Sequence, residues 1–198
     1  MNESLAEHYL KDALQTFRDY KKLAEKALAQ IEGEEFFVTL DEESNSIAVI
    51  IKHMAGNMIS RWTDFLTTDG EKPDRHRDME FVITKGTTRD ELLAYWERGW
   101  ACVFSAVEPL RAGDFDRKVL IRGEEHSIIE AVNRQLTHYA YHIGQLIFLA
   151  KHFRSAQWQS LSIPRNKSAE FNAYLTGNTE RPHRLEELQK FIGETKKQ

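Results

Sequence analysis

Two histidines four residues apart are the first feature of this sequence that could do chemistry: His138 and His142, in the segment His138-Tyr-Ala-Tyr-His142. If the segment is helical, both side chains lie on one face with Cβ atoms about 6 Å apart, so both rings can reach one ion at roughly 2.0–2.1 Å. The residue after His138 is Tyr139 rather than glutamate, so the segment lacks the general base of the HExxH metalloproteases. The spacing favours a metal site but not that kind of peptide hydrolysis.

A third histidine, His53, lies at the edge of an apolar stripe in another segment, with Asn57 one turn further along. Neighbouring helices in a bundle are 8–10 Å apart, so imidazoles from two helices can meet at one ion, and a water would complete an open site. Nitrogen ligands suit Zn or Ni, which we expect, with Fe or Mn as alternatives. The alternative interpretation is that these rings are hydrogen-bonded histidines at the rim of the core. The other histidines lack a partner one turn away in an apolar helix: His8, His76, His126, His152 and His183.

Several other side chains could support the histidines or contact a substrate. Each residue type also has a more common structural role. An amide on a helix flank and an exposed arginine are usually only solvated, and an aromatic residue in a helical stripe is more often part of the core. Cys102, between Trp100 and Val103, is expected to be a small buried hydrophobe rather than a nucleophile. The candidates are Asn57, Gln135, Gln145, Arg61 and Tyr139; no catalytic residue is assigned.

Four stretches with apolar residues at helical spacing predict four long helices that would position these groups. Three of them begin with Ser or Thr three residues before Glu, which is the pattern of a capping box. The expected helices run from Ser4 to a stop at Gly33, from about Ser44 to Leu66, from Thr88 until Pro109, and from Ser127 to Phe153.

The connections complete the expected architecture. The polar stretch 69–78 is too long for a tight turn, which predicts a crossing loop or a lid over a site, and the apolar runs 36–40 and 119–121 could be small strands. A short helix near 169–174 and a charged helix from about Arg184 are expected at the end of the chain. We therefore predict an all-α four-helix bundle with a long crossing between its second and third helices, as a single domain over residues 1–198.

Composition narrows the classes of partner. The 198 residues carry 31 acidic and 27 basic side chains, well mixed, for a formal charge of −4, so we expect no nucleic acid partner. The single cysteine excludes an internal disulfide framework and fits a reducing compartment. Charges recur every third or fourth residue near the N-terminus without an apolar run, so neither a signal peptide nor a membrane span is expected. We expect a cytoplasmic protein with no membrane partner.

One histidine in the second helical stretch and a His-x-x-x-His pair in the last resemble the DinB-like, YfiT-like superfamily. The resemblance covers nearly the whole chain, and further segments resemble a branch known only as a domain of unknown function. It implies a four-helix bundle, a homodimer, and a metal site formed by His53, His138 and His142. The segments are Ile51-Lys-His53-Met-Ala-Gly-Asn57, Gln135-Leu-Thr-His138-Tyr-Ala-Tyr-His142-Ile-Gly-Gln145, Trp62-Thr-Asp64-Phe, Thr68-Asp-Gly-Glu-Lys-Pro-Asp-Arg75, Ile121-Arg-Gly-Glu124 and Ile163-Pro-Arg-Asn-Lys-Ser168.

The resemblance also implies a function. Members of this superfamily include thiol transferases that use low-molecular-weight thiols and thiol-dependent isomerases, in which the metal lowers the pKa of the thiol. We therefore expect a metal-dependent enzyme with thiol transferase-like or hydrolase-like chemistry on a small molecule, such as a low-molecular-weight thiol. The alternative is a non-catalytic dimeric bundle that acts as a binding module and whose metal is structural or vestigial.

Overall fold

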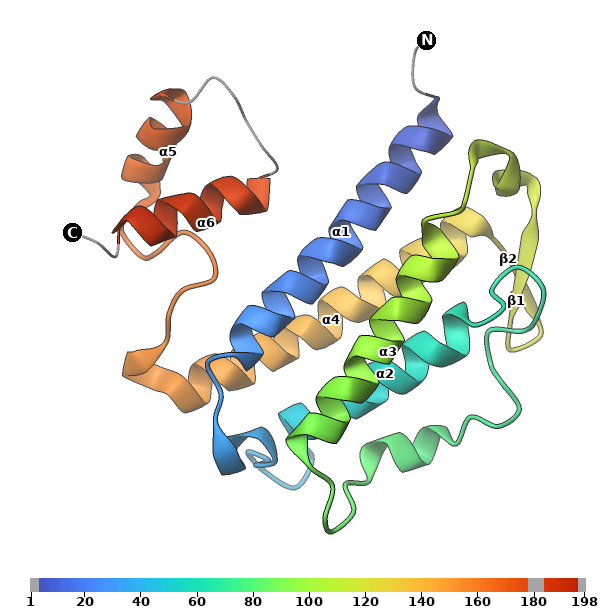
Figure 1. Ribbon diagram of the computed structural model, residues 1–198, viewed down its shortest axis with the longest axis horizontal. Coiled ribbons are helices and arrows are strands. Elements are labelled where there is room, and N and C mark those ends of the chain that lie inside the picture. Colours follow the sequence, from blue (N-terminus) through green and yellow to red (C-terminus); the bar gives the residue numbers. More distant parts are fainter. Residues whose placement is uncertain (1–3, 178–183, 196–198) are drawn as a thin grey trace. The chain divides into compact units, whose positions relative to one another are not determined.

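The computed structural model describes residues 4–177 and 184–195, and the chain divides into two compact units at Phe153 and Arg154. Each unit is described by itself, and a single domain over the whole chain stays a prediction. Within the described ranges the protein is mostly helical, with six α-helices and one small two-stranded sheet (Figure 1).

The first unit contains the four long helices α1 (Leu5–Leu28), α2 (Ile47–Trp62), α3 (Arg89–Val107) and α4 (Ile128–Arg154). In Figure 1, α2 packs along α3, and α1 also contacts α3. The strands β1 (Lys118–Ile121) and β2 (Glu124–Ser127) form an antiparallel hairpin that leads into α4. Three short 3-10 helices lie in the connections: Gly33–Phe36, Arg77–Phe81 and Ala112–Asp116.

The second unit consists of the 3-10 helix Ser155–Gln157 and the helices α5 (Ser168–Gly177) and α6 (Arg184–Thr195). α5 and α6 contact each other through aromatic rings, with the Phe171 and Phe191 ring centroids 5.1 Å apart. Both helices expected at the end of the sequence are therefore present.

All three predicted capping boxes are confirmed, at Ser4, Thr88 and Ser127. At the start of α4, for example, Glu130 N–H donates to Ser127 Oγ at 3.2 Å, and Ser127 N–H donates to the Glu130 carboxylate at 2.7 Å. Such boxes satisfy backbone groups that the first helical turn leaves without partners. They are formed within four consecutive residues, which is why the sequence predicts them.

An aromatic cluster in the core takes one ring from each long helix: Phe17, Trp62, Trp100 and Tyr139. The Phe17 ring centroid lies 5.9 Å from that of Trp62 and 5.8 Å from that of Tyr139, and Trp62 Nε1 donates to Tyr139 Oη at 2.9 Å. Aromatic pairs of this kind stabilise a core by about 0.5–1.5 kcal/mol beyond their buried area. With Tyr139 in the core, its neighbour His138 is placed at the edge of the core, toward α2.

Two predicted helices are shorter than expected. α2 begins at Ile47 instead of about Ser44, because Ser46 Oγ accepts the Val49 N–H at 3.2 Å and caps the helix. It ends at Trp62 instead of Leu66, because Asp64 adopts a left-handed conformation with φ of 49°. α1 ends at Leu28, and Gly33, with φ of 55°, instead begins a 3-10 helix.

The two short apolar runs behave differently. Residues 119–121 lie in β1 as predicted, and β1 pairs with β2 through a tight turn at Arg122 and Gly123, both with positive φ. Residues 36–40 form no strand, so that expectation is wrong: Phe36 ends a 3-10 helix and is fully buried, whereas Val38 and Leu40 are exposed. The alternation of buried and exposed side chains that a strand needs is therefore absent from this segment.

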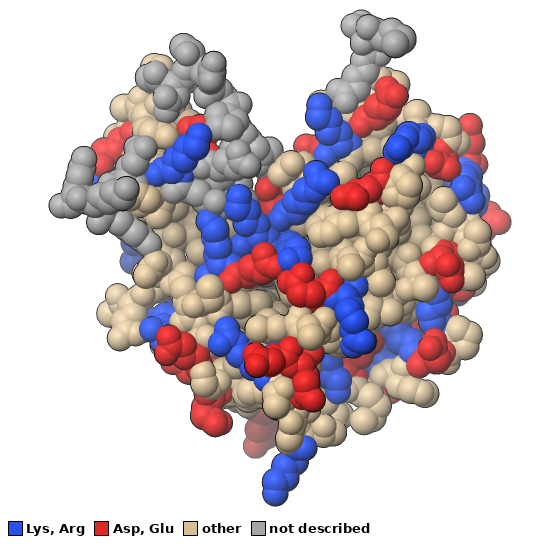
Figure 2. Space-filling view, viewed as in Figure 1, with Lys and Arg blue, Asp and Glu red and all other residues tan. Residues whose placement is uncertain are grey.

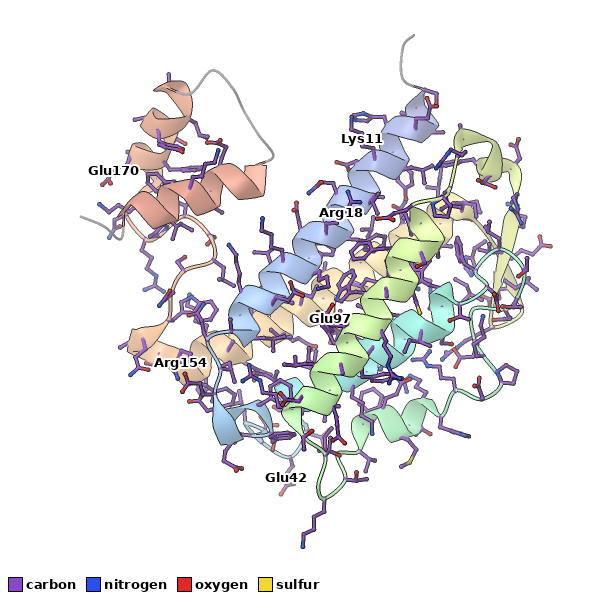
Figure 3. The ribbon with its side chains drawn as sticks, in the orientation of Figure 1. Lys11, Arg18, Glu42, Glu97, Arg154 and Glu170 are labelled. Carbon is purple, nitrogen blue, oxygen red and sulfur yellow. The ribbon has the colours of Figure 1, made fainter. Side chains whose placement is uncertain are left out.

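Charges of both signs are mixed on the face shown in Figure 2. Some pair between helices: Lys21 of α1 donates to Glu97 of α3 at 3.0 Å, and Arg18 of α1 donates to Glu108 at 2.9 Å (Arg18 and Glu97 are labelled in Figure 3). Across the parts of the chain that the structure describes, we find no helix with the combined length and apolarity that crossing a membrane requires.

Candidate metal centre

Three imidazole rings meet between α2 and α4: His53 from α2, and His138 and His142 from consecutive turns of α4. His138 Nε2 lies 3.4 Å from His53 Nε2 and 3.0 Å from His142 Nε2, and one ligand nitrogen from each ring lies within 4.8 Å of the other two. Two nitrogens bound to one tetrahedral ion at 2.0–2.1 Å would be roughly 3.3 Å apart. The spacing of these donor atoms therefore fits a single ion.

In two of these rings, the Nδ1 atom on the side away from the other histidines is held by a hydrogen bond. His53 Nδ1 donates to Glu80 Oε2 at 2.8 Å, and His142 Nδ1 donates to Gln145 Oε1 at 2.9 Å. Metal-binding histidines usually donate their other N–H to a carboxylate or carbonyl oxygen in this way, which fixes the tautomer and the ring orientation.

The hydrogen bonds at Nδ1 determine that the Nε2 atoms of His53 and His142 face His138 without a proton. A neutral ring with its proton on Nδ1 presents a lone pair at Nε2, so His53 and His142 both present lone pairs toward His138. His138 Nε2 can supply at most one proton between them. The cluster thus has more acceptors than donors, and a cation would satisfy all three nitrogens.

The electrostatics keep the rings of His138 and His142 neutral. Burial, followed by the charges of His142 and His53, lowers the pKa of His138 to about 3. Burial and then the charge of His53 lower the pKa of His142 to about 4, although the hydrogen bond to Gln145 acts in the opposite direction. Both rings are unprotonated at neutral pH, and an unprotonated imidazole is the form that binds a metal.

Glu80, the carboxylate behind His53, comes from the 3-10 helix in the connection between α2 and α3. Arg75 holds it with two bonds, Nε to Oε1 at 2.8 Å and Nη2 to Oε2 at 2.9 Å. Burial by itself raises the pKa of Glu80, but the bonds from His53 and Arg75 and the charge of Arg75 outweigh it, so the pKa lies below its usual value. Glu80 is therefore an ionised acceptor that aligns the His53 ring.

The connection that carries Glu80 is fastened to the rest of the unit. Asp69 accepts the backbone N–H groups of Arg122 at 2.8 Å and Gly123 at 2.7 Å in the β1–β2 turn. Gly70 N–H donates to Leu120 O at 2.8 Å, and its carbonyl accepts the Ser60 hydroxyl of α2 at 2.8 Å. The long connection predicted between the second and third helices is present, and it positions a partner of His53.

Gly56 of α2 leaves the space that Glu80 occupies. A Cβ atom there would clash with the Glu80 carboxylate, because it would lie only 2.8 Å from Cδ. We expect Gly56→Ala to displace Glu80 and to lower the free energy of unfolding by about 1–3 kcal/mol, as overpacking does. Loss of the bond to His53 should also weaken metal binding by roughly 10–100-fold.

The matched control is Gly144→Ala in α4, where an added Cβ meets nothing within 4 Å. We expect this variant to be neutral or more stable by up to about 1 kcal/mol, because alanine favours helix more than glycine does. Chemical denaturation and metal titration of both variants measure the effects. Equal behaviour of the two alanine variants would contradict the role given to Gly56.

The structure places the other predicted site residues in different surroundings. Gln145 contacts His142, and Asn57 and Gln135 are buried beside the histidines in a shared cavity. Tyr139 lies in the aromatic core, where burial raises the pKa of its hydroxyl. Arg61 is buried, and its Nη1 donates to the Gly70 carbonyl and, at 2.9 Å, to Glu71, so it holds the connection in place. His183 lies outside the described residues.

Glu80 and Arg75 are the functional residues that sequence reasoning missed. They stand in a polar segment, Arg75-His-Arg-Asp-Met-Glu80, whose composition is typical of a solvated loop. The structure buries both side chains, which are only 8% and 5% exposed. The unusual length of the connection was the one available signal.

Residues 4–167 match a family described as a protein of unknown function (DUF1572). No curated protein and no solved structure matches the chain. The matched range includes the four long helices, the connection that carries Glu80, and all three histidines. The chain therefore belongs to the DUF1572 family.

Proposed function

We propose that His53, His138 and His142 bind one divalent cation and that the protein is a metal-dependent enzyme acting on a small molecule. The observation that carries the proposal is the convergence of three Nε2 atoms, two of them on rings whose Nδ1 atoms are already bonded to Glu80 and Gln145. A divalent ion held there would lower the pKa of a bound thiol or water and so supply a nucleophile at neutral pH. Zn or Ni is the preferred ion, with Fe or Mn as alternatives.

Three protein ligands leave room for a substrate. Catalytic zinc sites have three protein ligands and an open position, whereas structural sites are closed by four. His53 and His138 also line a cavity, so a small molecule can approach them from that side. This arrangement supports a catalytic site over a structural one.

The surrounding residues have positioning roles. Glu80 is occupied by Arg75 and His53 and is held ionised, so it orients the ring and leaves proton transfer to the substrate or solvent. Gln145 does the same for His142. Thiol transferase-like or hydrolase-like chemistry fits this set, because both require a nucleophile generated at the open position.

The proposal includes membership of the DinB-like, YfiT-like superfamily. Its support is the packing of four long helices around one core, with one histidine on the second and two on the fourth. It also includes a homodimer in the cytoplasm and a small-molecule substrate such as a low-molecular-weight thiol, with neither a nucleic acid nor a membrane as partner.

The test is metal analysis of protein purified without chelator or a nickel column, followed by X-ray absorption spectroscopy. We expect one ion per chain with imidazole nitrogen ligands. Protein that neither contains nor takes up a stoichiometric ion would overturn the metal centre.

A panel of thiols with electrophilic acceptors, and of activated esters, then tests catalysis. Turnover that requires the ion supports the enzyme. A protein that binds the ion but turns over none of these compounds would favour the binding module with a structural or vestigial metal.

A further inference from the structure

A cavity of about 400 Å³ opens beside the histidines, and five arginines line it together with His53 and His138. The arginines come from α2, from the connection to α3, from the β1–β2 turn and from α4. Among the described residues that line the cavity there is no aspartate or glutamate. The arginines are Arg61, Arg75, Arg77, Arg122 and Arg134.

Two of these arginines are neutralised by buried or half-buried carboxylates. Arg75 bonds to Glu80 and lies 3.3 Å from Glu71, and Arg61 bonds to Glu71 at 2.9 Å. Both serve to hold the connection against α2. The positive charges of Arg61 and Arg75 are therefore largely compensated by Glu71 and Glu80.

The other three have little compensation. Arg122 Nε shares Glu71 at 3.2 Å, although Glu71 already serves Arg61 and Arg75. The carboxylate paired with Arg77 is that of Asp78, at 3.8 Å, whose side chain is 99% exposed and therefore screened by solvent.

Arg134, on α4, has the least charge compensation of the three. In the part of the chain that the structure describes, no ion pair is formed by its guanidinium. The carboxylate one turn earlier on α4, Glu130, is bound by the Ser127 capping box. The cavity thus keeps a net positive charge next to the three histidines.

Two buried polar atoms of cavity-lining residues also lack partners. Arg61 Nε and Gln135 Oε1 make no hydrogen bond to another described residue of the protein, and the two residues are only 6% and 3% exposed. More than nine in ten buried polar groups in proteins are hydrogen-bonded. The Arg61 N–H is a donor that an anion can satisfy, whereas the Gln135 oxygen is an acceptor and requires a donor. The Arg61 N–H is therefore the one of these two groups that supports an anionic ligand at the cavity.

From these observations we infer that the cavity binds an anionic group of the substrate, a carboxylate or a phosphate. Guanidinium groups bind both anions with paired N–H donors in one plane, which gives orientation as well as attraction. An anion held by Arg77, Arg122 and Arg134 places the rest of the molecule toward His53 and His138. This orienting role rests on the proposed metal centre, whereas anion binding itself does not.

The experiment is calorimetric titration of inorganic phosphate and of succinate into the full-length protein, both metal-free and metal-loaded. The variants are Arg134→Gln and Arg77→Gln. The control is Arg18→Gln, on α1, which contributes no residue to the cavity (Figure 3). We expect each cavity variant to weaken anion binding about tenfold in both metal states, and the control to bind as the wild type does.

The outcomes separate this inference from the proposed function. If the protein takes up no metal but binds the anion in a way that depends on the arginines, the inference is supported. The proposed metal centre is then contradicted. Binding that appears only with metal and is unchanged in both variants overturns the inference and leaves the metal centre intact. Failure of the wild type to bind either anion also overturns it. A preference for phosphate or succinate identifies which anion the cavity accepts.

Discussion

Replacing His142 with alanine is expected to reduce metal affinity by about 100-fold or more. The free energy of binding a structural zinc ion is about 10–16 kcal/mol over four ligands, so one ligand contributes roughly 3 kcal/mol. His142 Nε2 lies 3.0 Å from His138 Nε2, and the variant would leave only two nitrogens facing the ion. Competition with a chromophoric chelator measures the change.

The control for this prediction is His152→Ala. His152 lies on the same helix but is exposed and is no part of the cluster. We expect it to bind metal as the wild type does, and circular dichroism should show that both variants are folded. If His142→Ala and His152→Ala held metal equally well, the assignment of three ligands would be wrong.

Glu80→Gln is expected to have the largest effect on stability, lowering the free energy of unfolding of the metal-free protein by about 3 kcal/mol. The change leaves the guanidinium of Arg75 buried with Glu71, at 3.3 Å, as its remaining carboxylate. Removing one partner of a buried ion pair costs about 3–5 kcal/mol, because the other charge stays out of water. Metal affinity should also fall roughly 10–100-fold, because the His53 N–H then faces a neutral amide in place of an ionised carboxylate.

Glu97→Gln is the matched control, because it removes a carboxylate from an exposed pair with Lys21. Such pairs contribute at most about 1 kcal/mol. Urea denaturation at neutral pH compares the two variants, and Glu80→Gln combined with Arg75→Gln should recover part of the loss. An unfolding midpoint of Glu80→Gln equal to that of Glu97→Gln would show that the buried pair does not stabilise the fold.

The helices and the His138–His142 pair could be predicted from sequence because they depend on interactions between residues close together in the chain. The capping boxes at Ser4, Thr88 and Ser127 involve residues three apart, and His138 and His142 share a face because helix geometry places residues four apart on one side. The ends of α2 were harder to predict from sequence, since they depend on which of two serines, Ser44 or Ser46, caps the helix and on the left-handed conformation of Asp64.

The sequence by itself determined the helical elements, the His138–His142 pair and the candidacy of His53. Tertiary structure decided the rest, because it depends on contacts between residues far apart in the chain. Packing of α2 against α4 brings His53 Nε2 to 3.4 Å from His138 Nε2, across 85 positions of sequence. The burial of Glu80 with Arg75 and the gathering of arginines at one cavity arise in the same way. A charged residue in a polar segment looks the same in sequence whether it is solvated or buried against a partner, and only the fold distinguishes the two.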